Sequence, residues 1–480
     1  MTISYTFILY CVTINFLLFK ISAKLLEFEL NVTKIPLKES IKYSNFTNDI
    51  ISRQIVPLHV INQEVLTMQV CLGTPEQCFN VLYDTGSYHL WLASKYSLGC
   101  YSCKLFDEDS SSTFERKNNL LIIKYVTGSA TGYEAIDYLK INGRSKKFSW
   151  LLALSVEFNL EGVDGIIGFA REYAPDRANS YVSEKFSFID SLLQAKIINR
   201  KVFSQVFTDE DFTKAKLYIG EYPEDFSNSK NYSFCNIINK DSFLSQSNIK
   251  NLWACRLSYI LIGSPKKINF HKQSFKVDSR AVLDSGSNYI LASYDMAYVL
   301  KEIFLNFSEC YDDYDASSGI KFFSCSENFD LSKFPSFSLI LNGYAYTINS
   351  KRLFKEIILN GHKNFMFCII FSKRMDFWLL GQYFLRNFHI LFDYEKSIIA
   401  FNGNTDYITD FRKYTDDNDY YEFDYWLQIF LLFLVIAVLV LWMMYFVFKK
   451  CANYANEDVD PNNLLSRSGI INNRYYFNRF

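Results

Sequence analysis

Two short segments of the chain place an aspartate in the same local pattern. Val81–Ser87 reads Val-Leu-Tyr-Asp-Thr-Gly-Ser and Ala281–Ser287 reads Ala-Val-Leu-Asp-Ser-Gly-Ser, so Asp84 and Asp284 have equivalent neighbours. Mostly apolar residues precede each aspartate, and a hydroxyl residue, a glycine and a serine follow it. Glycine lets a chain reverse tightly, and hydroxyl groups can hydrogen-bond a carboxyl group at the tip of such a turn. The pattern indicates two carboxyl groups held on duplicated turns.

Two such turns brought face to face would form an acid–base pair. Like charges within a few ångström of each other cannot both ionise, so the pair holds one proton at acidic to mildly acidic pH. The ionised member can take a proton from a water molecule while the protonated member donates to a peptide carbonyl. This chemistry hydrolyses amides without a covalent intermediate, and we expect neither a cofactor nor a metal.

A second motif is also repeated. Ile166-Ile167-Gly168 ends 84 residues after Asp84, and Leu379-Leu380-Gly381 ends 97 residues after Asp284. Two motifs that recur in the same order indicate two homologous lobes. We predict an N-terminal lobe over residues 55–222 and a C-terminal lobe over 223–405, with the chain crossing near 220–225.

The elements that must position these turns are predicted to be short strands. Aromatic residues make up 18% of the chain, which favours strands, and the fold class is mainly β. Alternating apolar segments bounded by turn residues predict strands at 217–219, 337–341 and 344–348, the last after the turn Asn342-Gly343. Helical periodicity favours two helices, at 186–195 and 295–304.

The two ends of the chain carry long apolar segments of different kinds. Residues 1–23 have the pattern of a secretory signal peptide, and residues 24–54 then form a short proregion. Residues 426–448 contain no charge and are long enough to cross a bilayer as one C-terminal transmembrane helix. An acidic, tyrosine-rich stalk over 406–425 precedes this helix, and a cytoplasmic tail over 449–480 follows it.

These segments predict a single-pass type I membrane protein of the secretory or endolysosomal pathway. Lys449-Lys450 directly after the span places the tail in the cytoplasm and the lobes in the lumen or outside the cell. In the tail, Leu464 and Leu465 follow an acidic residue at the spacing of a sorting signal that adaptors bind; an incidental leucine pair is the alternative. The net charge of −1 gives no reason to expect a nucleic-acid partner.

Cysteine usage fits an oxidising compartment. Nine cysteines lie between the signal and the span, so one is left over if the others pair. Cys100-x-x-Cys103 is compatible with a redox or zinc motif, but without a second such pair or a suitably spaced histidine, a small disulfide loop is favoured. Four sequons are glycosylation candidates, at Asn31, Asn45, Asn231 and Asn306.

Over residues 55–403 the sequence resembles the pepsin-like (family A1) aspartic proteases, the group of cathepsin D, plasmepsins and β-secretase. Gly73-Thr74-Pro75, the two Asp-Thr/Ser-Gly triplets and both apolar-apolar-Gly motifs match the family in order. The resemblance implies a bilobal fold with the active site between the lobes. It also implies the roles of the residues after each aspartate, where Thr85 and Ser285 brace the loops, Ser87 and Ser287 bond the carboxylates, and Gly86 and Gly286 complete the triplets.

The resemblance also assigns a flap and two disulfides. The flap is the segment around Tyr125, Thr127 and Gly128, and Trp91 supports its tyrosine. Disulfides are implied between Cys100 and Cys103 and between Cys310 and Cys325. Cys71 and Cys78 are a further candidate pair, whereas the sequence does not say which two of Cys235, Cys255 and Cys368 join.

The expected function is an aspartic endopeptidase tethered to a membrane, active at acidic pH on peptides with hydrophobic residues beside the cleaved bond, and monomeric. Tyr88, His89 and Val126 depart from the family pattern and leave the specificity open, and Gln382 replaces a common aspartate. A narrow-specificity processing protease is a second possibility. A catalytically silent receptor that binds peptides in the cleft is the alternative of another class.

Overall fold

The structure is a computed structural model of the chain. It describes residues 26–35, 63–125, 128–141, 144–157, 162–171, 186–207, 214–223, 226, 232–238, 252–263, 274–315, 319–359, 362–403, 408–411 and 418–457. The fold divides into a compact unit that ends at Phe411 and a second unit that begins at Arg412. The first unit consists mainly of strands, as the sequence predicts.

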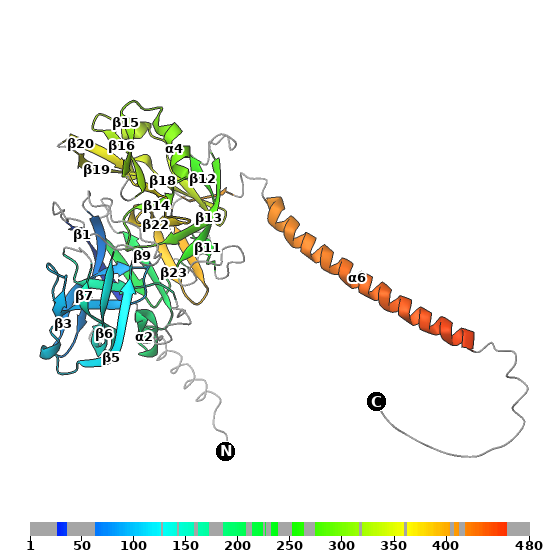
Figure 1. Ribbon diagram of the computed structural model, residues 1–480, viewed down its shortest axis with the longest axis horizontal. Coiled ribbons are helices and arrows are strands. Elements are labelled where there is room, and N and C mark those ends of the chain that lie inside the picture. Colours follow the sequence, from blue (N-terminus) through cyan, green and yellow to red (C-terminus); the bar gives the residue numbers. More distant parts are fainter. Residues whose placement is uncertain are drawn as a thin grey trace, which may run out of the picture. The chain divides into compact units, whose positions relative to one another are not determined.

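The first of two large sheets contains thirteen strands (Figure 1). Its order is β11 (Tyr232–Asn236), β24 (Ile398–Asn402), β23 (His389–Asp393), β9 (Val202–Phe207), β10 (Lys214–Ile219), β1 (Leu26–Ile35), β2 (Gln63–Leu72), β3 (Gln77–Asp84), β8 (Gly165–Gly168), β4 (Leu90–Leu98), β7 (Arg144–Val156), β6 (Ser129–Ile141) and β5 (Glu115–Lys124).

The second sheet contains twelve strands, all from the C-terminal half of the unit. Its order is β19 (Phe354–Leu359), β20 (His362–Phe367), β16 (Ile320–Ser326), β21 (Ile369–Ser372), β14 (Ile290–Ser293), β22 (Trp378–Leu380), β13 (Ser274–Leu283), β12 (Ala254–Ile262), β17 (Phe337–Leu341), β18 (Tyr344–Ile348) and β25 (Ile408–Asp410), and β15 (Cys310–Asp315) pairs with β16.

Helices are short in the first unit. Both predicted helices are confirmed, although each is shorter than expected at its N-terminal side. The helical elements are α2 (Phe188–Gln194), α4 (Met296–Phe304), α5 (Gln382–Leu385) and the 3-10 turns η1 (Glu108–Ser110), η7 (Leu331–Lys333) and η8 (Ser350–Arg352).

The predicted hairpin at residues 337–348 is confirmed with its turn. Strands β17 and β18 pair from Leu341–Tyr344 outwards. Asn342 and Gly343 take φ values of +50° and +84°, the left-handed backbone that a two-residue hairpin turn requires and that Asn-Gly adopts readily. Local sequence alone therefore determines this element.

The boundary between the lobes is less simple than a single crossing near 220–225. Strands β11, β23 and β24 follow that point in the chain, yet they join the first sheet, where β23 pairs with β9 and Phe392 lies opposite Phe203. The reason is that β9 and β23 are buried, apolar strands in the middle of a sheet and need a partner on both edges. The two lobes consequently share one sheet.

Two segments predicted to lie outside the lobes contain strands. β1 lies within the predicted proregion and pairs with β2 on one side and β10 on the other. β25 lies within the predicted stalk and pairs with β18, and the next residue, Phe411, is buried. In both segments the strands pair through backbone N–H and C=O groups, which every residue type carries. The composition and charge of a segment therefore do not predict this pairing.

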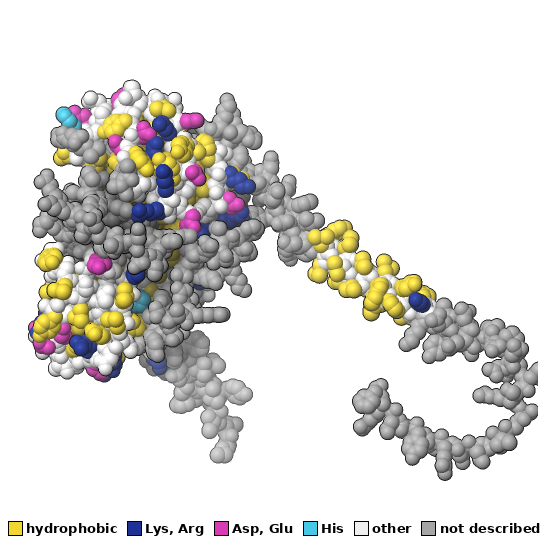
Figure 2. Space-filling view, in the orientation of Figure 1, with side chains coloured by type: hydrophobic (Ala, Val, Ile, Leu, Met, Phe, Trp, Pro, Cys, Tyr) yellow, Lys and Arg dark blue, Asp and Glu magenta, His cyan; other side chains and the backbone are white. Residues whose placement is uncertain are grey.

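The second unit contains one long helix, α6 (Asn418–Glu457). Phe430–Lys449 within it is long and apolar enough to cross a membrane, with a mean hydropathy of 2.9 and no buried side chain. Figure 2 shows hydrophobic side chains along this stretch and a basic side chain at its end. The helix begins within the predicted stalk and includes the predicted span, while residues 1–25 and 458–480, with Leu464 and Leu465, lie outside the described part of the chain.

Candidate active site

Asp84 is the last residue of a buried strand. β3 carries it, and β8 pairs in parallel with β3 so that Gly168 lies opposite Asp84. β4, which leaves the aspartate loop, pairs with the same β8 in the antiparallel sense. The apolar-apolar-Gly motif therefore fills the space between the strand that enters the aspartate loop and the strand that leaves it.

Asp284 has the same arrangement in the second sheet. It directly follows β13, and β22 pairs in parallel with β13 and antiparallel with β14, the strand that leaves the loop. A Cβ atom on either closing glycine would meet backbone of the aspartate loop, at 2.4 Å from the Ser87 carbonyl oxygen for Gly168 and at 2.5 Å from the Ser287 carbonyl oxygen for Gly381. This close approach explains why both motifs end in glycine.

The two loops are joined by four reciprocal hydrogen bonds. The backbone N–H of Thr85 donates to Ser285 Oγ, and that of Ser285 donates to Thr85 Oγ1, both at 2.9 Å. Each hydroxyl also donates across the junction, Thr85 Oγ1 to the Leu283 carbonyl and Ser285 Oγ to the Tyr83 carbonyl, again at 2.9 Å. Because both side chains are fully buried, these bonds fix the loops to each other in an environment without competing water.

The carboxyl groups of Asp84 and Asp284 lie against each other's loops. A Cβ atom on Gly86 would lie 2.6 Å from Asp284 Oδ1, and one on Gly286 would lie 2.6 Å from Asp84 Oδ1. Each carboxyl group also accepts the backbone N–H of its own glycine, at 2.8 Å for Gly86 and 2.9 Å for Gly286. The structure thus brings the two carboxyl groups, two hundred residues apart in sequence, to one place.

The electrostatics of the pair are unequal. Burial and the charge of Asp84 raise the pKa of Asp284 well above its usual range. Burial also raises the pKa of Asp84, but the nearby Ser87 hydroxyl and the hydrogen bond from the Gly86 N–H oppose the rise. Because the pKa of both carboxyl groups is raised by burial, the pair favours a state that holds one shared proton.

The serines after the two triplets differ in their contacts. The Ser87 hydroxyl lowers the pKa of Asp84. For Asp284 the corresponding contact is made by the backbone N–H of Ser287. The second loop has another support, since Gln382 Nε2 donates to the Ser285 carbonyl at 2.8 Å. Gln382, a departure from the family pattern, thus contacts the Asp284 loop directly.

The predicted flap is a hairpin of β5 and β6. Lys124 lies opposite Ser129, and the N–H of Tyr125 donates to the Gly128 carbonyl at 2.8 Å. Burial and the charge of Asp84 raise the pKa of Tyr125, and the neighbouring side chains of Ser87 and Trp91 oppose this rise. Tyr125, Trp91 and Ser87 are therefore close together beside Asp84, while Val126 and Thr127 lie outside the described residues.

Tyr88 and His89 are turned inward. Both side chains are buried, and the His89 ring contacts Tyr88 and Phe186 at centroid distances of 5.6 and 5.5 Å. Burial lowers the pKa of His89 to about 4. These two residues therefore pack beneath the Asp84 loop.

Four disulfides are present among the described residues, joining Cys71 to Cys78, Cys100 to Cys103, Cys235 to Cys255 and Cys310 to Cys325. The ambiguity among three cysteines is thereby settled, because Cys235 on β11 bonds to Cys255 on β12 and ties the first sheet to the second. Cys368 retains a buried thiol.

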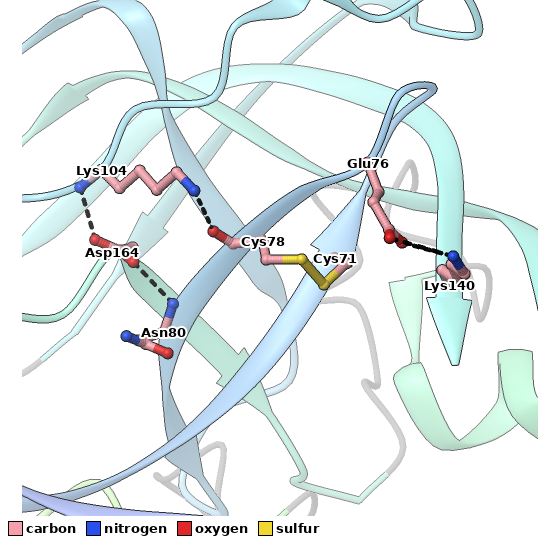
Figure 3. Close-up of a disulfide and its surroundings, with 7 residues drawn as sticks. All are labelled: Cys71, Glu76, Cys78, Asn80, Lys104, Lys140 and Asp164. Atoms are coloured by element: carbon pink, nitrogen blue, oxygen red, sulfur yellow. Dashed lines mark hydrogen bonds and ion pairs between the residues drawn. A yellow bond between two sulfur atoms is a disulfide. The ribbon is translucent and has the colours of Figure 1, made fainter. Parts of the chain in front are cut away.

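The Cys71–Cys78 disulfide closes the hairpin whose second strand ends at Asp84 (Figure 3). Lys104 Nζ donates to the Cys78 carbonyl at 2.8 Å, and its backbone N–H donates to Asp164 Oδ1 at 2.6 Å. Asp164, directly before the Gly-Ile-Ile-Gly of β8, also accepts the N–H of Asn80. Asp164 thus joins the start of β3, the start of β8 and the Cys100–Cys103 loop.

The glycosylation candidates fall in different regions. Asn306 is exposed just after α4. Asn31 lies in β1, opposite Thr67 and Lys214. Asn45 and Asn231 lie outside the described residues. No group of three or more potential metal ligands occurs in the part of the chain that the structure describes.

Comparison with known proteins agrees with this geometry. The family described as eukaryotic aspartyl protease matches residues 66–403. The chain belongs to this family, and it is an aspartic endopeptidase. It is 24% identical to pepsin A of Gallus gallus over 338 residues, which cover 68% of this chain and 80% of that protein. To cathepsin D of Homo sapiens it is 24% identical over 361 residues, covering 69% and 79%.

Rat renin gives a longer match. The chain is 23% identical to renin of Rattus norvegicus over 379 residues, which cover 76% of this chain and 84% of that protein. Pepsin, renin and cathepsin D are all aspartic endopeptidases, so peptides or proteins are the substrates of this family.

Two aromatic residues beside the site belong to no repeated motif. Trp253 Nε1 and Tyr394 Oη both donate to the Phe169 carbonyl, each at 2.9 Å. Neither residue type nor spacing marks them in the sequence. Neither position belongs to a motif that the chain repeats, and the two residues are far apart in the chain. Their contacts become visible only when the sheets are assembled.

Proposed function

We propose that Asp84 and Asp284 are the catalytic dyad of a membrane-tethered endopeptidase that works at acidic pH. The observation that carries this proposal is the crossed contact, in which Gly86 lies against the Asp284 carboxyl group and Gly286 against that of Asp84. The two carboxyl groups interact directly with each other, so they are close enough to act together on one water molecule and on the carbonyl of one peptide bond.

The proton positions define the first step. Asp84, as carboxylate, takes a proton from the water while the water oxygen bonds to the peptide carbonyl carbon. Asp284 gives the shared proton to the carbonyl oxygen in the same step, and burial, which raises the pKa of both carboxyl groups, keeps that proton on the dyad until then. The product is a tetrahedral diol with no charge on either new hydroxyl group.

The second step restores the dyad. The C–N bond breaks as Asp84 passes the proton it gained to the departing amine nitrogen. Asp284 takes back a proton from one hydroxyl of the diol, which becomes a carboxylic acid. Asp84 is then again a carboxylate and Asp284 again carries the proton, as at the start.

The pH range follows from the same two groups. As the pH rises through the upper apparent pKa of the dyad, the shared proton is lost and with it the acid for the first step. As the pH falls through the lower apparent pKa, both groups are protonated and no base remains. Activity is therefore bell-shaped in pH, with its alkaline limb extended by the raised pKa of Asp284.

Apolar residues beside the cleaved bond suit the flap side of the site. Tyr88, Trp91 and Tyr125 belong to one cluster of packed side chains next to Asp84. Extended substrate side chains of similar character would add to this cluster by burying apolar surface. Mass-spectrometric mapping of cleavage products from a peptide library tests this preference, and products without enrichment of apolar residues at the cut would contradict it.

The test of the dyad uses the full-length protein in detergent and an internally quenched peptide with apolar residues at the cut. We expect cleavage near pH 4–5 that pepstatin blocks. Asp84→Ala removes the base and should abolish turnover, whereas the exposed Asp278→Ala should leave it unchanged. Retention of activity by Asp84→Ala would overturn the assignment.

A further inference from the structure

The segment Phe169–Arg171 directly follows β8 and is hydrogen-bonded to the Asp84 loop through its backbone. The N–H of Phe169 donates to the Asp84 carbonyl at 2.7 Å, and that of Ala170 donates to the Ser87 carbonyl at 2.8 Å. Any shift of this segment is consequently transmitted to Asp84 and Ser87. What fixes the segment therefore helps to fix one half of the dyad.

Three side chains from the C-terminal half of the chain hold the other side of this segment. Trp253 Nε1 and Tyr394 Oη donate to the Phe169 carbonyl, and Tyr394 Oη also lies 3.2 Å from the Ala170 carbonyl oxygen. Arg171 donates to Ser397 Oγ at 3.0 Å. We call Trp253, Tyr394 and Ser397 the interlobe clasp.

The clasp is itself firmly positioned. Tyr394 and Ser397 lie in the turn between β23 and β24, and the N–H of Tyr394 donates to the Lys201 carbonyl at 3.0 Å. Trp253 is fully buried, and its ring contacts that of Tyr394 at 4.8 Å. Burial raises the pKa of Tyr394 well above its usual range, so the hydroxyl keeps its proton and remains a donor.

The second catalytic loop is held in a different way. Gln382, at the position that corresponds to Phe169, donates through its own side chain to the Ser285 carbonyl, and its N–H donates to the Ser287 carbonyl. Besides the reciprocal Thr85–Ser285 bonds that join the two loops, the described contacts of Gln382 support the Asp284 loop from within its own half of the chain. The segment behind the Asp84 loop is instead bonded by side chains from the other half of the chain.

We propose that the residues of the interlobe clasp are positioning residues, which set the distance between the two catalytic carboxyl groups by fixing Phe169–Arg171 with side chains from the C-terminal half of the chain. Without the clasp, the Asp84 loop relaxes away from Asp284. A misplacement well below the size of an atom already slows a reaction that depends on aligned groups. This inference rests on the dyad proposed above.

The test is Tyr394→Phe in the full-length protein, which removes one hydroxyl group and keeps the ring. We expect kcat to fall at least about tenfold, with KM within about twofold, because the change affects alignment rather than substrate contacts. The pH profile should also narrow, since carboxyl groups that lie farther apart influence each other less and their two apparent pKa values approach.

Tyr346→Phe is the matched control. Tyr346 is also a buried tyrosine, and its hydroxyl lies 2.8 Å from Ser233 Oγ, outside the catalytic loops. We expect it to lose a similar amount of thermal stability and to keep the wild-type kcat and pH profile. If Tyr394→Phe behaves like Tyr346→Phe in both readouts, the clasp is only structural and the inference is wrong.

A second variant covers the case in which Tyr394→Phe does not fold. Ser397→Gly removes the acceptor of Arg171 at a residue whose φ is +53°, a conformation that glycine adopts readily. It should lower kcat about threefold and narrow the profile, and an unchanged profile would also contradict the inference. Activity retained by Asp84→Ala would instead refute the dyad itself, so the two failures are distinguishable.

Discussion

Thr85 and Ser285 occupy equivalent positions on the two loops, and each uses its hydroxyl group twice, once as acceptor and once as donor. A buried hydroxyl group with both functions satisfied stabilises a single arrangement of the backbone around it. The short side chain matters as well, since it leaves the carboxyl groups beside it free to approach each other. At this scale the site depends on small polar groups held without water.

His89 gives a prediction on the pH dependence of stability. Its pKa falls from 6.5 to about 4 in the folded protein, so between these values the unfolded chain binds a proton that the folded chain does not. The free energy of unfolding should therefore fall as the pH drops through this window, by up to about 3 kcal/mol. His89→Gln should remove this part of the pH dependence, measured by urea unfolding at pH 7 and pH 4.

His362→Gln is the control for that measurement, because His362 is exposed at the start of β20. It should show the same fall in stability between pH 7 and pH 4 as the wild type. An equal fall in His89→Gln would mean that the buried imidazole does not contribute.

The sequence predicts the catalytic loops residue by residue because their chemistry is local and repeated. Asp84, Thr85 and Gly86 are each recognisable from type and spacing, and so are their counterparts. Trp253 and Tyr394 are not, because a hydrogen bond to a distant backbone carbonyl has no local pattern. The sequence also does not predict the burial of Tyr88 and His89. Two residues with polar groups directly after a turn give no sign that their side chains pack against apolar residues such as Phe186.

At the scale of elements, two disulfides join directly opposite residues of adjacent antiparallel strands. Cys71–Cys78 links β2 to β3, and Cys310–Cys325 links β15 to β16, each with a Cα–Cα distance of 4.0 Å. Only the first hairpin leads to a residue of the proposed dyad. The two disulfides therefore allow a comparison of two cross-linked hairpins, of which one leads to Asp84 and the other does not.

Removal of each disulfide by paired Cys→Ser changes should separate stability from activity. Loop entropy predicts losses of about 2 kcal/mol for Cys71–Cys78 and about 3 kcal/mol for Cys310–Cys325, since the second closes a longer loop. The kcat of the folded protein should fall severalfold only for the first, because β3 ends at Asp84. Equal kcat values for the two variants, measured where both are folded, would contradict this account.

Strands and the predicted hairpin could be read from alternation and turn residues, because both signals act over a few residues. The order of strands could not. β23 and β24 join β9 across nearly two hundred residues. β1 lies between β10 and β2, and β25 forms the edge of the second sheet, although the composition of their segments indicated a leader and a stalk. Such pairing depends on which backbone edges remain open after the rest has folded.

At the scale of the whole molecule, the chain combines a protease unit ending at Phe411 with a unit that contains α6. The apolar stretch Phe430–Lys449 has the length and hydropathy of a membrane span. We infer that this helix tethers the enzyme and that the protease unit does not need it for catalysis. As part of this inference, we propose a type I orientation, because Lys449 and Lys450 directly follow the span.

Removal of residues 412–480 should convert the protein into a soluble enzyme with a kcat/KM within about twofold of the full chain. The control is removal of residues 458–480 alone, which leaves α6 intact and should leave the protein in the membrane fraction after alkaline extraction. If the protein without residues 412–480 stayed in the membrane fraction, α6 would not be the membrane tether. Glycosidase sensitivity at the exposed Asn306 reports whether the lobes face the lumen.

The dyad is tested most directly by kcat/KM for the quenched peptide between pH 3 and pH 7 in the wild type, Asp84→Asn and Asp284→Asn. Asparagine keeps the size of each side chain and removes its proton exchange. We predict a bell-shaped profile for the wild type and a loss of at least about a thousandfold at every pH for either variant, with thermal unfolding still cooperative. A folded variant that keeps a tenth of the wild-type activity at any pH would contradict catalysis by this pair.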